Sequence, residues 1–270
     1  MNNRFRKNNK DSRREKSGAP APEAAQAPAT GFAVVCRTDI GKVRRSNQDS
    51  VIEAGALVGV ADGMGGHQGG ETASAMARDA LVDALRDKAP DAESLAAGIR
   101  EANAAVFARA EAEDSLRGMG TTMTVLWLGA REAFVGQVGD SRCYRYAGGA
   151  LTQITNDHSM VMEMARAGII TAEEAATHPM RNVITRAVGT DPMVEPDLFV
   201  LPRAKDDLWL VCSDGLHGMV SDKDIAAVLA SKDTDEKKAD RLMAAALENG
   251  GHDNISLVLL RDLTGGEGCA

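Results

Sequence analysis

The order of apolar segments along the chain limits the folds open to it more than any other feature. Two long segments of helix-forming composition, residues 71–88 and 93–112, follow each other directly, and a run of short strand-like segments comes next. In the second helical segment the apolar residues recur at helical spacing, as Leu95, Ile99, Ala102 and Val106. Doubly wound and barrel folds alternate single strands with single helices. Consecutive helices followed by consecutive strands therefore argue against them.

The strand-like segments are short and their links contain glycine, which favours antiparallel hairpins. They cover residues 32–39, 50–54, 57–61, 122–128, 132–138, 142–147, 150–155, 207–213 and 255–261. Further helices are expected near 158–167, 171–176, 222–231 and 235–248. Two antiparallel sheets packed face to face, with helices on their outer faces, would use all of these elements. We predict an α+β fold of this kind, a β-sandwich flanked by pairs of helices in four layers, α-β-β-α.

The composition is that of a globular chain that needs no cross-links. Hydrophobic residues make up 44% of the chain and charged residues 26%, as in ordinary folded domains. Charges interrupt every apolar stretch before about 18 residues, so no transmembrane segment is expected. The basic N-terminus is not followed by an apolar core, so it is not expected to be a secretory signal. The four cysteines are scattered, which argues against disulfides or a zinc ribbon and predicts a cytoplasmic protein. We expect a monomer.

Charge is distributed unevenly along the chain. The total is −8, but residues 1–17 hold seven basic and two acidic side chains, a net of +5, which leaves −13 for the rest. A body this acidic repels nucleic-acid phosphates, so no nucleic-acid partner is expected. Residues 1–30 turn from basic to Ala/Pro-rich and predict a disordered tail; a basic arm for a partner or an acidic lipid surface is the alternative. The folded domain is expected over 31–262, with a frayed C-terminus at 263–270.

Aspartates gather at the predicted strand ends. Asp62, Asp140 and Asp214 each follow an apolar strand, whereas Asp49 and Asp253 each precede one. Glycine lies next to or near four of them, and glycine lets the backbone approach a ligand closely. Any one of these residues could be a turn residue, because Asp-Gly is a common turn dipeptide. The hypothesis of a shared site depends on all five together.

Converging carboxylates repel one another unless cations lie between them. Hard divalent cations prefer the oxygens of carboxylates, carbonyls and water. The pattern does not supply the His-rich or Cys-rich set that zinc prefers. If the aspartates form a metal site, we therefore expect Mg²⁺ or Mn²⁺ to occupy it.

Several motifs in order give the chain a family resemblance. They are TDIGKVRRSNQDS (38–50), VADGMGGHQGGETAS (60–74), GMGTTMTV (118–125), VGDSRCYRY (138–146), LTQITNDHS (151–159), HPMRNVITRAVG (178–189), LVCSDGLHGMV (210–220) and GGHDNISLVLL (250–260). The chain resembles the metal-dependent serine/threonine protein phosphatases, the PPM or protein phosphatase 2C family, in their bacterial form. The resemblance runs from about Gly31 to Asp262 and implies a β-sandwich with two Mn²⁺ or Mg²⁺ ions at one rim.

The resemblance also implies a role for each residue of this rim. Asp62 corresponds to the carboxylate that bridges the two ions, and Gly63 lends its backbone carbonyl. Asp214 and Asp253 correspond to further metal ligands, and Asp49 to the acid that holds metal-bound water.

Two more positions complete the implied site. Asp140, together with Asp214, matches the position that helps to bind a third, weaker metal ion in bacterial members. Arg44, five residues before Asp49, corresponds to the phosphate-binding arginine. Its planar fork can grip two phosphate oxygens at once, which a lysine cannot do.

Two positions depart from the animal members of the family, and one of them is Gln48, which precedes Asp49 where those members have Glu. Two residues after the bridging aspartate they carry a histidine, proposed as the general acid, where this chain has Met64. His67 lies three residues further along, and we expect that it is not the main general acid. The segment 159–190 resembles the flap of bacterial members, beside the catalytic rim, where His158 and His178 either assist or serve only the structure.

The activity that the resemblance implies is hydrolysis of phosphoserine and phosphothreonine in phosphorylated proteins, by attack of a water that bridges the metal ions. Such an enzyme would act in bacterial signalling and oppose a serine/threonine kinase. Two alternatives stay open: a metallohydrolase of small phosphate esters, and a catalytically inactive phosphoprotein-binding module of the same fold. The inactive module would have lost a metal aspartate, and all of the expected ones are present.

Overall fold

The computed structural model describes Met1 and residues 31–65, 69–171, 174–175 and 178–266. The tail predicted over residues 1–30 lies outside these residues except for Met1. His67, parts of the helix predicted at 171–176 and the last four residues of the chain also lie outside them. None of the described helices is both long and apolar enough to cross a lipid bilayer.

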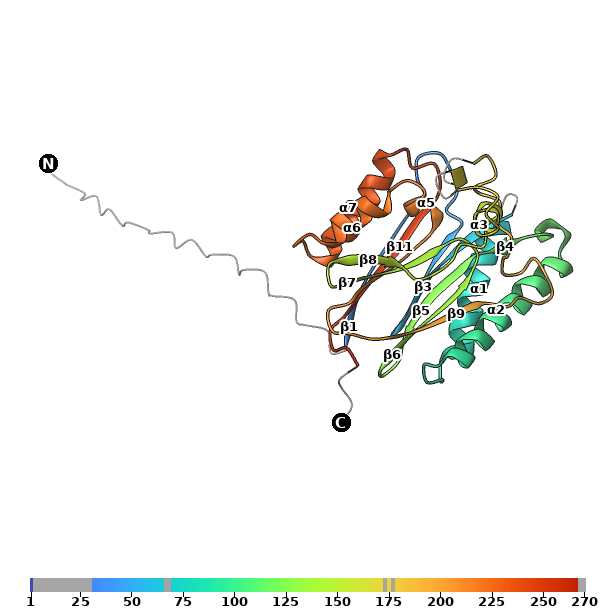
Figure 1. The fold of residues 1–270 in the computed structure, drawn as a ribbon, viewed down its shortest axis with the longest axis horizontal. Coiled ribbons are helices and arrows are strands. Elements are labelled where there is room, and N and C mark those ends of the chain that lie inside the picture. The colour runs from blue at the N-terminus through green and yellow to red at the C-terminus, as the bar shows by residue number, and fades with distance from the viewer. Residues whose placement is uncertain (2–30, 66–68, 172–173, 176–177, 267–270) are drawn as a thin grey trace.

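Two sheets form the centre of the molecule (Figure 1), and the strand pairings within them are antiparallel. The first has the order β1 (Phe32–Asp39), β11 (Ile255–Asp262), β10 (Leu208–Cys212), β7 (Arg142–Ala147), β8 (Ala150–Gln153). The second has the order β2 (Asp49–Ala54), β3 (Leu57–Met64), β5 (Met123–Leu128), β6 (Glu132–Val138), β9 (Asp197–Pro202), and the short β4 (Gly120–Thr121) pairs with β3.

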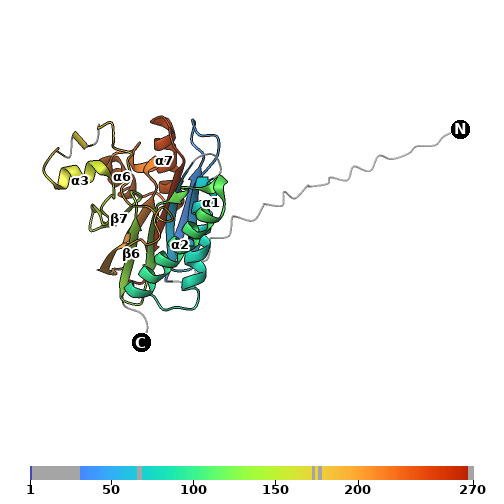
Figure 2. The same ribbon diagram turned by 90° about the vertical axis from the view of Figure 1, so that its right-hand side faces the viewer.

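A pair of helices covers the outer face of each sheet. The second sheet is covered by α1 (Gly69–Leu85) and α2 (Ala92–Ala112), and the first by α6 (Asp222–Leu229) and α7 (Asp235–Glu248). Figure 1 shows the two pairs on opposite sides of the sandwich, and Figure 2 views the molecule from the side of α1 and α2. The predicted four-layer α-β-β-α fold is confirmed. Shorter helices are η1 (Asp114–Leu116), α3 (Met160–Arg166) and α5 (Asp214–His217).

Three apolar layers separate the four structural layers. In β5, Val125 and Trp127 pack with α1 and α2, whereas Leu126 packs between the two sheets. In β10, Leu210 packs with α6 and α7, and Trp209 packs between the sheets. Because both faces of these strands are covered, their sequences are continuous apolar runs. Burial of both faces fixes the strands, and their ends then define a rim.

The hairpin that carries two of the aspartates is longer than its sequence predicts. Strand β2 begins at Asp49 instead of residue 50, and β3 continues to Met64 instead of ending at residue 61. Asp49 lies directly opposite Asp62 in this hairpin, and β4 pairs with the last two residues of β3. Because of this extension, Asp49 and Asp62 are both paired residues of the sheet and do not belong to a loop.

The sequence did not predict β9. This edge strand alternates between half-buried and exposed residues, with Val200 49% exposed, and it ends at Pro202. Proline and an exposed face are both typical of an edge strand. At the other end of the sandwich from the β5–β6 turn, the β1–β2 loop, α3, α5 and β4 come together (Figure 1).

Candidate metal centre

The aspartates singled out from the sequence meet at this end of the sandwich. A cavity of about 230 Å³ is lined by Asp62, Asp140, Asp214 and Asp253, and Arg44 lies at the same cavity. Gly63 and Met64 also line it. Asp49 lies behind Asp62, across the hairpin. The structure therefore brings together all seven of the predicted site residues.

The backbone of Asp62 is held from both sides. Its N–H donates to Thr122 Oγ1 at 2.9 Å. Its carbonyl oxygen accepts from Thr121 Oγ1 at 2.9 Å and from the N–H of Thr122 at 2.8 Å. These three bonds fix the point from which the Asp62 carboxylate enters the cavity.

Gly63 is required by the close approach of α1. A Cβ atom at this position would lie 2.0 Å from the carbonyl oxygen of Gly70 and 2.6 Å from that of Gln48. Both neighbours are backbone atoms that cannot move aside. Only glycine therefore lets the first turn of α1 and the β1–β2 loop pack against the cavity wall.

Asp214 opens α5 immediately after β10. A Cβ atom on the next residue, Gly215, would lie 1.9 Å from the carbonyl oxygen of Asn254. The glycine therefore lets α5 pack directly on the segment that carries Asp253. This contact explains why Asp214 and Asp253, which are far apart in the chain, line one cavity.

Asn254 anchors the loop that carries Arg44. Its Nδ2 donates to the carbonyl oxygens of Ile40 and Ser46, both at 2.9 Å, and its Oδ1 accepts from the N–H of Gln48 at 2.9 Å. Asn254 is 3% exposed, so these bonds are shielded from water. They hold the β1–β2 loop against the rim.

Arg44 projects from this loop onto the rim. Its Nη2 donates to Asp253 Oδ2 at 2.6 Å, and half of its side chain is exposed. The hydrogen bond to Asp253 raises the pKa of Arg44 above its ordinary value. The guanidinium therefore stays charged at the mouth of the cavity.

Burial makes ionisation of the carboxylates costly. It raises the pKa of Asp49 to about 6 and that of Asp140 to about 6. Burial, followed by repulsion from Asp140 and Asp253, raises the pKa of Asp214 to about 8. Burial and repulsion from Asp49 and Asp214 raise the pKa of Asp62 well above its usual range. Without a cation, the cavity therefore disfavours the ionised form of these four carboxyl groups.

The carboxylates fit hard divalent cations. Among the described residues, Asp49 Oδ1 and Asp214 Oδ1 are buried without a hydrogen-bond partner, which is costly unless a positive group lies nearby. The Asp62 side chain lies beside both of these residues. Within the described part of the chain, no three His, Cys, Asp or Glu side chains are already set around one point.

Sequence reasoning missed the polar side chains that hold the carboxylates. Besides Thr122 and Asn254, Ser213 Oγ donates to Asp49 Oδ2 at 2.9 Å. Each of these residues stands within one of the motifs, and Ser213 and Asn254 directly neighbour Asp214 and Asp253 in the sequence. That position was the available signal for these two, whereas Thr122 lies in a motif to which no site residue was assigned.

The two histidines of the flap segment do not line the cavity. His158 is buried, its Nδ1 accepts from the N–H of Gly139 at 3.1 Å, and its Nε2 lies 3.3 Å from Asp197 Oδ2. His178 Nδ1 accepts from the N–H of Met180 at 3.2 Å. Both make local structural contacts.

Comparisons with known proteins agree with one another. A family model described as protein phosphatase 2C matches residues 42–250. The serine/threonine phosphatase stp of Listeria monocytogenes is 41% identical over 240 residues, which cover 84% of this chain and 95% of that protein. The crystal structure of the Mycobacterium tuberculosis serine/threonine phosphatase PstP/Ppp has a TM-score of 0.81 and 39% identity, and the match covers 86% of this chain and 99% of that one. A structure of the PstP catalytic domain in complex with two manganese ions has a TM-score of 0.79 and 37% identity, and the match covers 86% of this chain and 98% of that one.

Proposed function

This chain belongs to the protein phosphatase 2C family and is a metal-dependent serine/threonine protein phosphatase, and from this premise we propose a role for each residue of its site. The observation that carries the proposal is the group of carboxylates around one cavity, where burial and mutual repulsion raise the pKa values of Asp62 and Asp214 above their ordinary range. Asp62, Asp214, Asp253 and the carbonyl of Gly63 hold two Mn²⁺ or Mg²⁺ ions. The manganese complex of the related PstP domain supports Mn²⁺. Asp140 and Asp214 share a third, weaker site.

The bound ions supply an acidified water and neutralise the charge of the phosphate. Asp49 orients the attacking water. Its Oδ2 is held by Ser213, and its Oδ1, which has no hydrogen-bond partner among the described residues, would accept a hydrogen bond from that water. Asp49, held by Ser213, would thus orient the nucleophile.

Arg44 binds the phosphate group. Its contact with Asp253 uses one nitrogen, and a guanidinium carries five N–H donors in a fixed fork. The remaining donors can reach phosphate oxygens at the cavity mouth, where the side chain is half-exposed. This role depends on Asn254, which holds the loop of Arg44 in place.

The leaving alcohol takes its proton from water. Met64 lines the cavity where animal members of the family carry a histidine, and a thioether has no proton to donate.

The substrates are phosphorylated proteins, and the enzyme opposes a bacterial serine/threonine kinase in signalling. We place it in the cytoplasm, since Cys36, Cys143 and Cys212 are free thiols. The phosphatase domain is assigned to residues 31–262.

The experiment compares kcat/KM for a phosphothreonine protein with that for a nucleoside monophosphate, both in Mn²⁺. We expect the phosphoprotein to be preferred by at least about tenfold, because binding contacts beyond the phosphate raise kcat/KM. The Asp62→Asn variant controls for a contaminating phosphatase. A preference for the nucleotide would instead establish the alternative, a hydrolase of small phosphate esters.

A further inference from the structure

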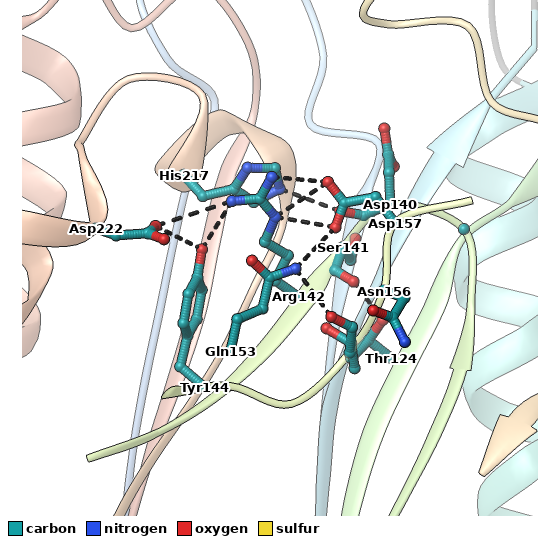
Figure 3. Close-up of polar contacts among 12 residues, drawn as sticks. Thr124, Asp140, Ser141, Arg142, Tyr144, Gln153, Asn156, Asp157, His217 and Asp222 are labelled. Carbon is teal, nitrogen blue, oxygen red and sulfur yellow. Dashed lines mark hydrogen bonds and ion pairs between the residues drawn. The ribbon is translucent and has the colours of Figure 1, made fainter. Parts of the chain in front are cut away.

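One side chain joins the segments of two site aspartates. His217 lies three residues after Asp214 on the one-turn helix α5. Its Nε2 is 3.1 Å from the backbone carbonyl oxygen of Asp140, as Figure 3 shows. A carbonyl oxygen can only accept, so Nε2 carries a proton and donates it. The bond therefore ties the last residue of α5 to the turn that follows β6.

These residues also share a second cavity. Asp140, Asp214 and His217 line a cavity of about 320 Å³ beside the metal centre. The two aspartates line both cavities, so they form the wall between them. Asp214 and His217 belong to one helical turn, closed by the bond from the N–H of Gly218 to the carbonyl of Asp214 at 2.7 Å. A shift of His217 would therefore move Asp214.

The turn that carries Asp140 is itself held firmly. Arg142 donates to both oxygens of the buried Asp157, at 2.9 and 2.7 Å, and its Nη1 donates to Tyr144 Oη at 2.9 Å (Figure 3). On the other side, Ser141 Oγ and Thr122 Oγ1 share a hydrogen bond of 2.9 Å. Because the Asp140 turn is fixed in this way, the bond from His217 transmits that fixed position to α5.

We propose that His217 is a positioning residue, which sets the separation of Asp140 and Asp214 and thereby the affinity of the third, weaker cation site. The inference rests on the proposed function, in which these two carboxylates share that site. His217 does not bind the cation. It acts through the backbone of Asp140 and through the helical turn of Asp214.

The experiment counts manganese ions bound by the full chain. The chain is titrated with Mn²⁺, and the electron paramagnetic resonance signal of the free ion is measured at each addition. The resulting binding curve gives the number of sites and the Kd of each. His217→Leu removes the donor and keeps the volume. His217→Gln retains an N–H donor near the position of Nε2. Asn249→Leu is the matched control, because Asn249 Nδ2 donates to the carbonyl of Met219 at 2.8 Å and so anchors the same segment without reaching Asp140.

We expect His217→Leu to weaken the third site by about tenfold or more, the usual effect of losing a group that orients a metal ligand. The two tighter sites should keep their Kd values, and His217→Gln and Asn249→Leu should match the wild type at all three. An unchanged third site in His217→Leu would overturn the proposal, as would an equal loss in Asn249→Leu, or a wild type that binds only two ions. Failure of the wild type to bind two ions would instead remove the proposed function on which the inference rests.

Discussion

Replacing Asp214 with asparagine should stabilise the metal-free protein, although it removes a proposed metal ligand. Burial, together with repulsion from Asp140 and Asp253, raises the pKa of Asp214 to about 8. In the unfolded chain the same carboxyl ionises at its ordinary pKa near 4. At pH 8 the Asp214 carboxyl therefore ionises more readily in the unfolded chain than in the folded one, which destabilises the wild-type fold. Asparagine has nearly the same shape and carries no charge.

The size of this effect follows from the two pKa values. At about 1.4 kcal/mol for each pKa unit, their difference gives an upper limit of about 6 kcal/mol at pH 8. The buried amide has to find partners for its own N–H groups, which offsets part of the gain. We expect a net gain of about 2–3 kcal/mol, or about 4–12 °C in the unfolding midpoint of a domain of this size.

The sign of the pH dependence is also fixed. Because the pKa of Asp214 is raised in the folded state, the stability that this carboxyl contributes is present at low pH and is lost as the pH rises toward about 8. The advantage of Asp214→Asn should therefore be smaller at pH 5 than at pH 8. Thermal unfolding in EDTA at the two pH values measures it.

Asp262→Asn is the matched control. Asp262 is fully buried and is paired with Arg203 at 2.7 and 2.8 Å, away from the cavity. Breaking a buried ion pair destabilises a protein by about 3–5 kcal/mol, so this variant should lose stability. If Asp214→Asn lost as much as Asp262→Asn at pH 8, the carboxylates of the rim would not repel one another as described.

Three further predictions concern catalysis. Arg44→Ala should lower kcat/KM for a phosphothreonine peptide by about 10- to 150-fold, since a charge-assisted bond to phosphate is worth about 1.5–3 kcal/mol; Arg45→Ala is the control, and calorimetry that showed lost metal affinity in Arg44→Ala would give Arg44 a structural role. His67→Ala should slow the hydrolysis of an aryl phosphate and of phosphothreonine by similar, modest factors, because we expect that His67 is not the general acid. Loss of a general acid, worth about 10²–10⁴-fold, would mainly slow phosphothreonine, whose alkoxide is the poorer leaving group. A hundredfold loss on phosphothreonine alone would therefore make His67 the acid. Deletion of residues 1–30 should leave turnover of an aryl phosphate unchanged, and a tenfold fall would place the tail in the catalytic domain.

The layers of the fold could be predicted because local patterns determine them. Helical spacing in 93–112 and short apolar runs with glycine-containing links are visible in any window of the sequence. The extension of β3 to Met64 was not visible, because it depends on pairing with Gly120, far along the chain. The edge strand Asp197–Pro202 was missed because one of its faces is exposed and proline ends it.

The candidate site likewise contains residues that a local sequence pattern predicts and contacts that no local pattern predicts. Asp62 and Asp214 could be found because each follows an apolar strand and precedes a glycine. Their supporting contacts could not be found, because they join residues distant in sequence: Thr122 bonds to Asp62 over 60 positions, and Ser213 bonds to Asp49 over 164. The first contact is set by strand pairing within one sheet and the second by how the two sheets stack, and no single window of sequence contains either.

The most direct test of the central claim is phosphate release from a phosphothreonine peptide by the wild type and by Asp62→Asn. Wild-type turnover should require Mn²⁺ or Mg²⁺ and stop in EDTA. Asp62→Asn should keep less than about 1% of the rate, since it loses several kcal/mol of charge stabilisation at the metal centre, while it unfolds as cooperatively as the wild type. A wild-type rate that persists in EDTA, or an Asp62→Asn rate within a few-fold of the wild type, would contradict the account.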